Sequence, residues 1–325
     1  MGKIENDYGY LFKNNSDLAK ELLIDKTTKK GIIWATDMYA KYGKGFAFSD
    51  SISTDIYVLN RNLFLKARSK KSKMDKMLRS KNNAEVFTPS WICNVQNNLV
   101  DNSWFGYSNV FNEEIEGGWI TNSNKIAFPD NKNWIDYLSD ARLEIACGEA
   151  PYIVSRYDSV SGEEIPLEKR IGIMDRKFRI LRENCTNDEE WIDYSLIILK
   201  SIYGYEYQGD NLIIARENVF FGYLDYYYEK FGKLPKDEFM NKILEIISWN
   251  FWQMDGLKYV IPNSCTNRRL EKYTLFDGVQ VEEYLCPGCQ KDLIYKHNGI
   301  YSKVKDWDTH KSIKFINLLN RNNHF

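Results

Sequence analysis

Three short apolar stretches, each ending at a small or acidic residue, constrain the fold of this chain most strongly. ARLEIACGEAPY runs from apolar residues into a turn at Gly148, while SIYGYE and WNFWQMDGL end at Glu206 and Asp255. The stretches EEWIDYSLIILKSI, QGDNLIIARENVFFGYLDYYYEKFG and DEFMNKILEII have helical spacing and lie between them. Strands that alternate with helices predict an α/β fold with a Rossmann-like sheet.

The rest of the chain flanks this core. Residues 1–83 mix short apolar runs with polar breaks, which predicts an N-terminal helical extension. Residues 84–258 form the predicted core, in which Pro89 ends a loop and the following residues have helical spacing. Residues 259–325 are predicted as a small C-terminal segment that contains a Cys/His group.

A run of basic residues lies at the end of the N-terminal extension. The net charge of the chain is -1, so contact with a nucleic acid requires a local basic patch. Between positions 66 and 81, where Asp75 is the one acid, the cations are Lys66, Arg68, Lys70, Lys71, Lys73, Lys76, Arg79 and Lys81. Contact with DNA phosphates, with the first five as candidates, and a solvated basic loop or helix are both open.

The sequence also bounds the compartment. No apolar stretch approaches the roughly 18 to 20 residues of a spanning helix, and the first residues contain no apolar signal core. The 6 cysteines lack the regular spacing of a secreted disulfide framework. We therefore expect a cytoplasmic protein with reduced cysteines and no membrane partner.

The ends of the three predicted strands form a candidate ligand site. In an open α/β sheet, ligands bind beyond the carboxyl ends of adjacent strands. Small residues let the backbone approach a ligand, and an acid after a second strand can accept the protons of ribose hydroxyls. The alternative is structural, with surface or paired acids and a small cysteine in the core. The candidate residues are Glu144, Ala146, Cys147, Gly148, Glu206 and Asp255.

These residues, in this order, resemble the motifs of the amino-methylating, adenine-type DNA methyltransferases. LEIACGEAPYI is similar to the first motif, GYEYQGDNLIIARENV to the second and WNFWQMDGL to the third. AEVFTP resembles the FTP-type motif of the type I and type IIG restriction-linked methyltransferases. The likeness covers roughly residues 84 to 258 and reads especially like proteins labelled restriction endonuclease subunit M.

The resemblance implies a function as well as a fold. The cofactor would be S-adenosylmethionine, with Glu206 on the ribose and Asp255 on the adenine amino group. Glu144, Ala146, Cys147 and Gly148 would form the first loop, and the residues covering the cofactor would be Phe87, Thr88 and Pro89. The reaction would methylate an exocyclic amine of DNA, most simply that of adenine, within a restriction-modification system.

Two departures keep an alternative open. The first loop has Glu149, Ala150 and Pro151 where the family prefers a small polar residue and a glycine. No NPPY or DPPY tetrapeptide is present, because the 7 prolines are never adjacent. The alternative is a degenerate cofactor- and DNA-binding subunit, which needs a partner chain or a homodimer, or an anti-restriction regulator. A sheet that binds another nucleotide, or no ligand, is a third reading.

The C-terminal segment carries the metal candidates. A CxxC pair with one cysteine upstream and one histidine downstream has the ligand number and types of a tetrahedral zinc site. Two other interpretations of the first cysteine are a nucleophile that attacks a pyrimidine ring and an inert buried thiol. The predicted zinc ligands are Cys265, Cys286, Cys289 and His297.

Overall fold

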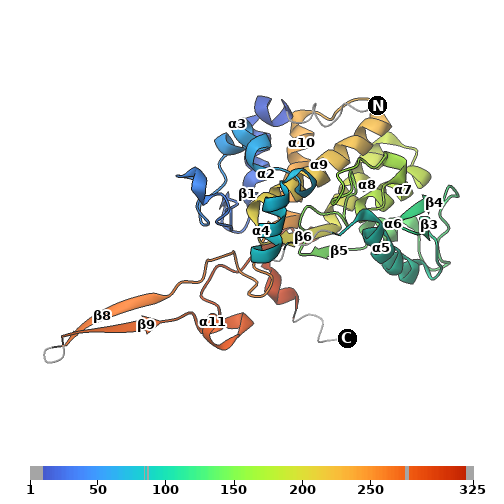
Figure 1. Cartoon of the computed structure of the whole chain (residues 1–325). Helices are drawn as coiled ribbons and strands as arrows, with labels where there is room; N and C mark the ends of the chain where they lie inside the picture. Colours follow the sequence, from blue (N-terminus) through green and yellow to red (C-terminus); the bar gives the residue numbers. More distant parts are fainter. Residues whose placement is uncertain (1–9, 84, 86–87, 275–277, 320–325) are drawn as a thin grey trace.

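The computed structural model describes residues 10–83, 85, 88–274 and 278–319 and has a mixed α/β architecture with small sheets (Figure 1). Its central sheet consists of three parallel strands in the order β5, β6, β7. They span Arg142–Ile145, Ile202–Glu206 and Phe251–Gln253. These are the three stretches that the sequence predicts as strands, so this prediction is confirmed.

Two pairs of helices connect the strands. Helices α7 (Ile173–Asn184) and α8 (Asp188–Lys200) lie between β5 and β6, and α9 (Gly209–Phe231) and α10 (Asp237–Asn250) lie between β6 and β7. Gly232 ends α9 with a φ of 67°, a left-handed conformation that glycine adopts at little cost. The sequence predicts α8, α9 and α10, but it does not predict α7, which the structure shows.

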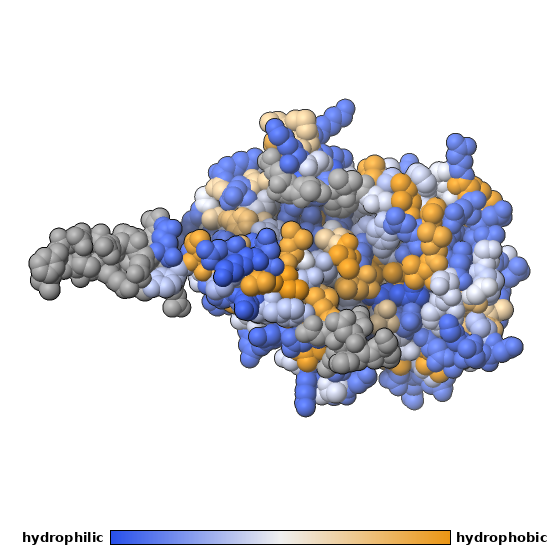
Figure 2. Space-filling view, turned by 90° about the horizontal axis from the view of Figure 1, so that it is seen from below, coloured by the Kyte–Doolittle hydropathy of each residue, from blue (hydrophilic) through white to orange (hydrophobic). Residues whose placement is uncertain are grey.

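The two faces of the central sheet are covered differently. Helices cover one face, as expected for right-handed crossovers that step in one direction across a sheet (Figure 1). On the opposite face Tyr205 and Trp252 pack against Phe315 of the C-terminal segment. Leu143 and Ile145 of the edge strand β5 remain 39% and 68% exposed. This side of the molecule accordingly shows apolar residues scattered across its surface (Figure 2).

The N-terminal residues join the main core. Leu18 and Leu22 of α2 are fully buried in the same hydrophobic cluster as residues of α9 and α10. The described residues of this extension are largely helical, with a short hairpin between α2 and α3. The elements are α2 (Ser16–Leu23), β1 (Ile24–Asp25), β2 (Lys30–Gly31), α3 (Thr54–Phe64) and α4 (Lys73–Asn83).

A smaller unit precedes β5. Helix α5 (Ser90–Phe105) begins directly after Pro89, as the sequence predicts, and Gly106 ends it in a left-handed conformation. The hairpin of β3 (Asn112–Ile115) and β4 (Gly118–Thr121) follows. Helix α6, Trp134–Ser139, leads into β5, and its first turn is held by a reciprocal cap between Asn133 and Asp136.

The C-terminal segment contains a long hairpin. Strands β8 (Arg268–Thr274) and β9 (Gly278–Tyr284) pair antiparallel, and Figure 1 shows them projecting away from the rest of the molecule. Helix α11 (Pro287–Lys291) follows, and β10 (Lys303–Lys305) pairs with β11 (Ser312–Lys314). The short 3-10 helices are Ala40–Tyr42, Arg68–Lys70, Leu167–Lys169, Ile294–Lys296 and Phe315–Leu318. No helix in the described part of the chain combines the length and apolar character needed to cross a bilayer.

Candidate functional site

The three predicted ligand loops meet at one edge of the central sheet, which we call the carboxyl edge. The backbone N–H of Cys147, just after β5, donates to the carbonyl of Tyr205 in β6 at 2.8 Å. The N–H of Met254, just after β7, donates to the carbonyl of Glu206 at 3.0 Å. The Cys147 turn therefore adjoins the end of β6, which in turn adjoins the start of the Asp255 loop.

Glu206 ties the first loop to the second. Its carboxylate accepts the N–H of Gly148 at 2.9 Å and the N–H of Gln208 at 3.1 Å. The residue is only 6% exposed, and burial, which outweighs these hydrogen bonds, raises the pKa of Glu206 to about 7. Gly148 itself has a φ of 53°, which brings its N–H toward this carboxylate without a side chain in the way.

Glu144 is a second buried carboxylate at the same edge. One of its oxygens, Oε1, accepts the N–H of Tyr152 at 3.4 Å, while Oε2 is buried without a hydrogen-bond partner. Burial, followed by the nearby charge of Glu206, raises the pKa of Glu144 well above its usual value. Among the described residues, neither carboxylate has an ion-pair partner. The edge thus holds two buried acids and no protein cation to neutralise them.

The predicted cofactor-covering segment approaches Glu144 from α5. Burial and then the nearby charge of Glu144 raise the pKa of Cys93 in α5 to about 12. The carbonyl of Thr88 accepts the hydroxyl of Ser159 at 2.8 Å and the thiol of Cys93 at 3.7 Å. Thr88 therefore lies beside Ser159 and the first turn of α5. Phe87 lies outside the described residues.

Asp255 lies at the start of the third loop. Its Oδ1 atom accepts the N–H groups of Leu257 and Lys258 at 3.0 and 3.1 Å, so the carboxylate caps its own turn. The side chain is 14% exposed, and its charge, after burial, raises the pKa of Tyr207 beyond β6. The structure thus brings Asp255 and the Glu206 strand end together.

Glu149 holds the bulkier first loop in place. Its carboxylate accepts the N–H of Arg68 at 2.6 Å and the hydroxyl of Tyr157 at 2.8 Å. Its carbonyl accepts the side-chain amide of Asn218 in α9 at 2.9 Å. Sequence reasoning missed these partners, because Arg68 and Asn218 are distant in the chain and none of the three belongs to a recognisable motif.

The basic segment, residues 66–81, is partly turned inward. Arg79 is 1% exposed and forms ion pairs with Asp210 and with Glu85, the latter at 2.8 Å. The Nζ atom of Lys71, also buried, is 3.6 Å from Asp210, and Arg68 pairs with Glu85 at 3.0 Å. Of the five candidates for phosphate contact, Arg68 and Lys71 are therefore engaged in ion pairs within the protein.

Other cations of the segment remain on the surface. Lys66, Lys70 and Lys73 are exposed. Lys66 and Lys70 line a hollow of about 350 Å³, to which Arg61 and Arg156 also contribute. These exposed residues are the part of the predicted phosphate-binding set that the structure leaves accessible.

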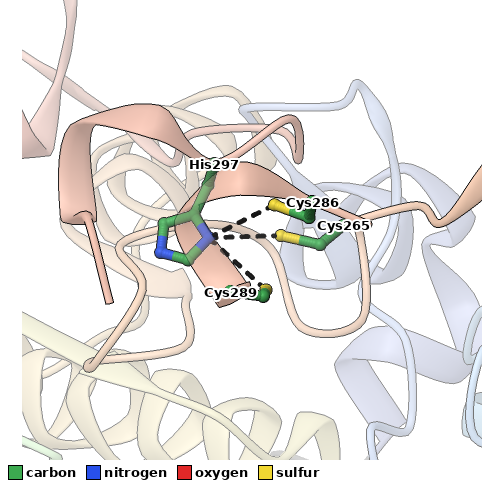
Figure 3. A group of neighbouring side chains, drawn as sticks. All are labelled: Cys265, Cys286, Cys289 and His297. Carbon is green, nitrogen blue, oxygen red and sulfur yellow. Dashed lines mark hydrogen bonds between the residues drawn. The ribbon is translucent and has the colours of Figure 1, made fainter. Parts of the chain in front are cut away.

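The four predicted zinc ligands converge, and we call them the Cys3His cluster: Cys265, Cys286, Cys289 and His297. Their ligand atoms all lie within 4.8 Å of one another. Figure 3 shows the three sulfurs on the side of the imidazole that carries Nδ1, and their distances to this atom are 3.6, 3.6 and 3.5 Å. The cluster can hold a metal ion such as zinc, and the placement of Cys265 favours a ligand over a nucleophile. All 6 cysteines are free thiols.

A comparison with protein-family models, curated proteins and solved structures finds no match to this chain.

Proposed function

We propose that the chain binds S-adenosylmethionine at the carboxyl edge and acts as an adenine-type DNA methyltransferase or as a cofactor-binding subunit of one. The supporting observation is the buried pair Glu144 and Glu206, which has no ion-pair partner among the described residues. Burial raises the pKa of both acids and so disfavours their ionised forms, which a bound cation would stabilise, and S-adenosylmethionine carries an ammonium and a sulfonium group. A cationic nucleoside therefore fits the electrostatics of this edge.

Each carboxylate has a role in this proposal. The Oε2 atom of Glu144, which lacks a hydrogen-bond partner, would accept the ammonium group of the cofactor. Glu206 would accept the ribose hydroxyls through lone pairs that its two backbone hydrogen bonds leave available. Asp255 would bind the adenine amino group, and Thr88 and Pro89 would cover the methionine part. The parallel strands β5, β6 and β7 would be one half of a Rossmann-like sheet.

A specific observation favours the subunit form of this proposal. The chain has no adjacent prolines and so lacks the NPPY-type loop that holds a flipped adenine. The sheet also stops at β5, whose Leu143 and Ile145 are exposed on the sheet face opposite the helices. A partner chain that packs on this face of β5 would both cover these side chains and supply the base-binding loop. The exposed residues Lys66, Lys70 and Lys73 would contact DNA phosphates.

Ligand binding to the isolated chain tests the cofactor assignment. S-adenosylhomocysteine at a hundred times its dissociation constant should stabilise the protein by about 2.7 kcal/mol, seen as a rise in Tm. Glu206→Gln and Glu144→Gln should remove most of this rise, whereas the exposed Glu113→Gln should keep it. A wild-type protein whose Tm does not respond to the nucleoside would refute the proposal.

Transfer of a tritiated methyl group to duplex DNA then separates the two forms. Labelled DNA would identify the chain as a methyltransferase that works alone. Cofactor binding without label would identify a subunit or degenerate form, and in that case label should appear when the partner chain is added.

A further inference from the structure

The Cys3His cluster has the dimensions of a filled tetrahedral site. With Zn–S bonds of about 2.3 Å and Zn–N bonds of about 2.05 Å, a tetrahedron places sulfur and nitrogen roughly 3.6 Å apart. The three measured distances from sulfur to Nδ1 of His297 are 3.5 to 3.6 Å. These three distances match those of a tetrahedral site, and all four ligand atoms lie within 4.8 Å of one another.

The backbone around the cluster is shaped for these ligands. A Cβ atom on Gly288, inside the CPGC turn, would lie 2.5 Å from Nδ1 of His297, so only glycine fits there. A Cβ atom on Gly299 would lie 3.0 Å from the sulfur of Cys265. The N–H of Asn298 donates to the sulfur of Cys286 at 3.3 Å, a bond that stabilises a metal-bound thiolate. These features point to a structural metal centre.

The cluster joins chain segments that lie far apart in the sequence. Cys265 precedes the β8–β9 hairpin, and Cys286 and Cys289 follow it, so an ion would close the root of the hairpin. His297 comes from the segment that leads back to the main body. The ion would therefore fix three segments at one point.

The same segments hold the third ligand loop. We call residues 255–265 the Asp255 loop. Val260 bridges to Asp255 on one side and to Tyr301 on the other. The N–H of Ile261 donates to the carbonyl of Ile300 at 2.8 Å. The loop thus lies between the carboxyl edge and residues 300–302. Cys265 is the last residue of the loop, and His297 lies three residues before Ile300 in the adjoining stretch.

We propose that one zinc ion, bound by the Cys3His cluster, positions the Asp255 loop at the carboxyl edge, so that metal loss weakens adenosine binding there. Without the ion, the two stretches are still joined by backbone hydrogen bonds at the buried residues Ile261 and Ser302, but the Cys265 end of the loop loses its anchor and the loop is held less firmly at the edge. The effect on adenosine binding rests on the proposed function, whereas zinc binding and the positioning of the Asp255 loop do not.

Measurement of the metal content tests whether the cluster binds zinc. The purified chain should contain one zinc per molecule, and a cobalt-substituted form should show thiolate-to-cobalt charge-transfer absorption. Cys289→Ser and His297→Ala should lose the metal, while His297→Cys should restore it as a four-cysteine site. The buried Cys185→Ser, which is outside the cluster, serves as the control and should retain the zinc. A wild-type chain purified under reducing conditions that neither contains nor takes up zinc would overturn the proposal.

Hydrogen exchange and ligand affinity test the second part. Chelation should speed amide exchange in the Asp255 loop while α9 keeps its protection, which shows that the core is still folded. The affinity for S-adenosylhomocysteine should fall by roughly tenfold or more, within the usual range of coupling between sites. Loop exchange that does not respond to chelation would overturn the positioning role. If the zinc-loaded chain binds no nucleoside but its loop still responds, the proposed function fails and the metal role stands.

Discussion

At the scale of single residues, Glu206 carries the clearest physical signature. An acid whose pKa is about 7 in the folded protein, against 4.5 ordinarily, keeps its proton where the unfolded chain has lost it. The folded state then binds more protons between pH 4.5 and 7, so the free energy of unfolding falls as the pH rises through this window. The pKa difference between the folded and the unfolded state corresponds to a change in the free energy of unfolding on the order of 3 kcal/mol.

Glu206→Gln should flatten this pH dependence. The amide cannot ionise, so the loss of stability between pH 5 and 7.5 should be smaller in the variant than in the wild type. Urea unfolding at a series of pH values measures it, with Glu113→Gln as a surface control. Identical slopes in the wild type and in Glu206→Gln would show that the carboxylate is not buried as described.

The sequence identifies the acids at this edge but not their partners. Glu144, Glu206 and Asp255 are predicted because each ends or follows an apolar stretch, and the structure brings their strand ends together. Nothing in the sequence pairs Gly148 with Glu206 across 58 positions, or leaves one oxygen of Glu144 without a partner. These contacts depend on the order of strands, which a single sequence does not encode locally.

At the scale of elements, α4 shows how a charge pattern can mislead. The basic segment suggests a surface, yet Arg79 reaches Asp210 in α9, 131 positions away. Helix α7 is missed for a similar reason: its Arg176 and Lys177 look solvated in sequence but are 2% and 0% exposed. Arg176 bonds Asp101, and Lys177 bonds the carbonyls of Leu138 and Asp140. Because these cations occupy buried positions of α7, the apolar periodicity that would predict the helix is interrupted.

Arg79→Met should strongly destabilise the protein. The substitution keeps most of the side-chain volume but leaves Asp210 and Glu85 without their main cation, a loss worth about 3–5 kcal/mol when one partner of a buried pair is removed. Lys81→Met in the same helix is exposed and should change stability by less than about 0.5 kcal/mol. Urea denaturation of both variants measures the contrast, and equal stabilities would contradict the buried network.

At the scale of the whole molecule, the buried apolar residues form two separate hydrophobic clusters of unequal size. The large one joins the N-terminal helices to α7 through α10, and the small one joins Tyr205, Trp252 and Met254 to Val304 and Phe315. The sequence predicts the α/β core well because long helices and apolar strands are local patterns. It does not predict the β8–β9 hairpin, which lies between Cys265 and Cys286 of the Cys3His cluster.

Metal removal should therefore loosen one part of the molecule and spare the other. In the presence of a chelator, trypsin should cleave within residues 258–305 and leave a resistant core that contains α9 and α10. Mass spectrometry of the fragments over time measures this, and the zinc-loaded protein serves as the reference. Cleavage that begins in α9 or α10 would show that the ion supports the entire fold.

The projecting hairpin gives the protein reach. Each of its strands has seven residues and so extends about 23 Å, comparable to the radius of a small domain. A partner that contacts the outer part of the two strands would therefore be held away from the main body. Deleting equal numbers of residues from both strands would shorten this lever in steps without disturbing either hydrophobic cluster.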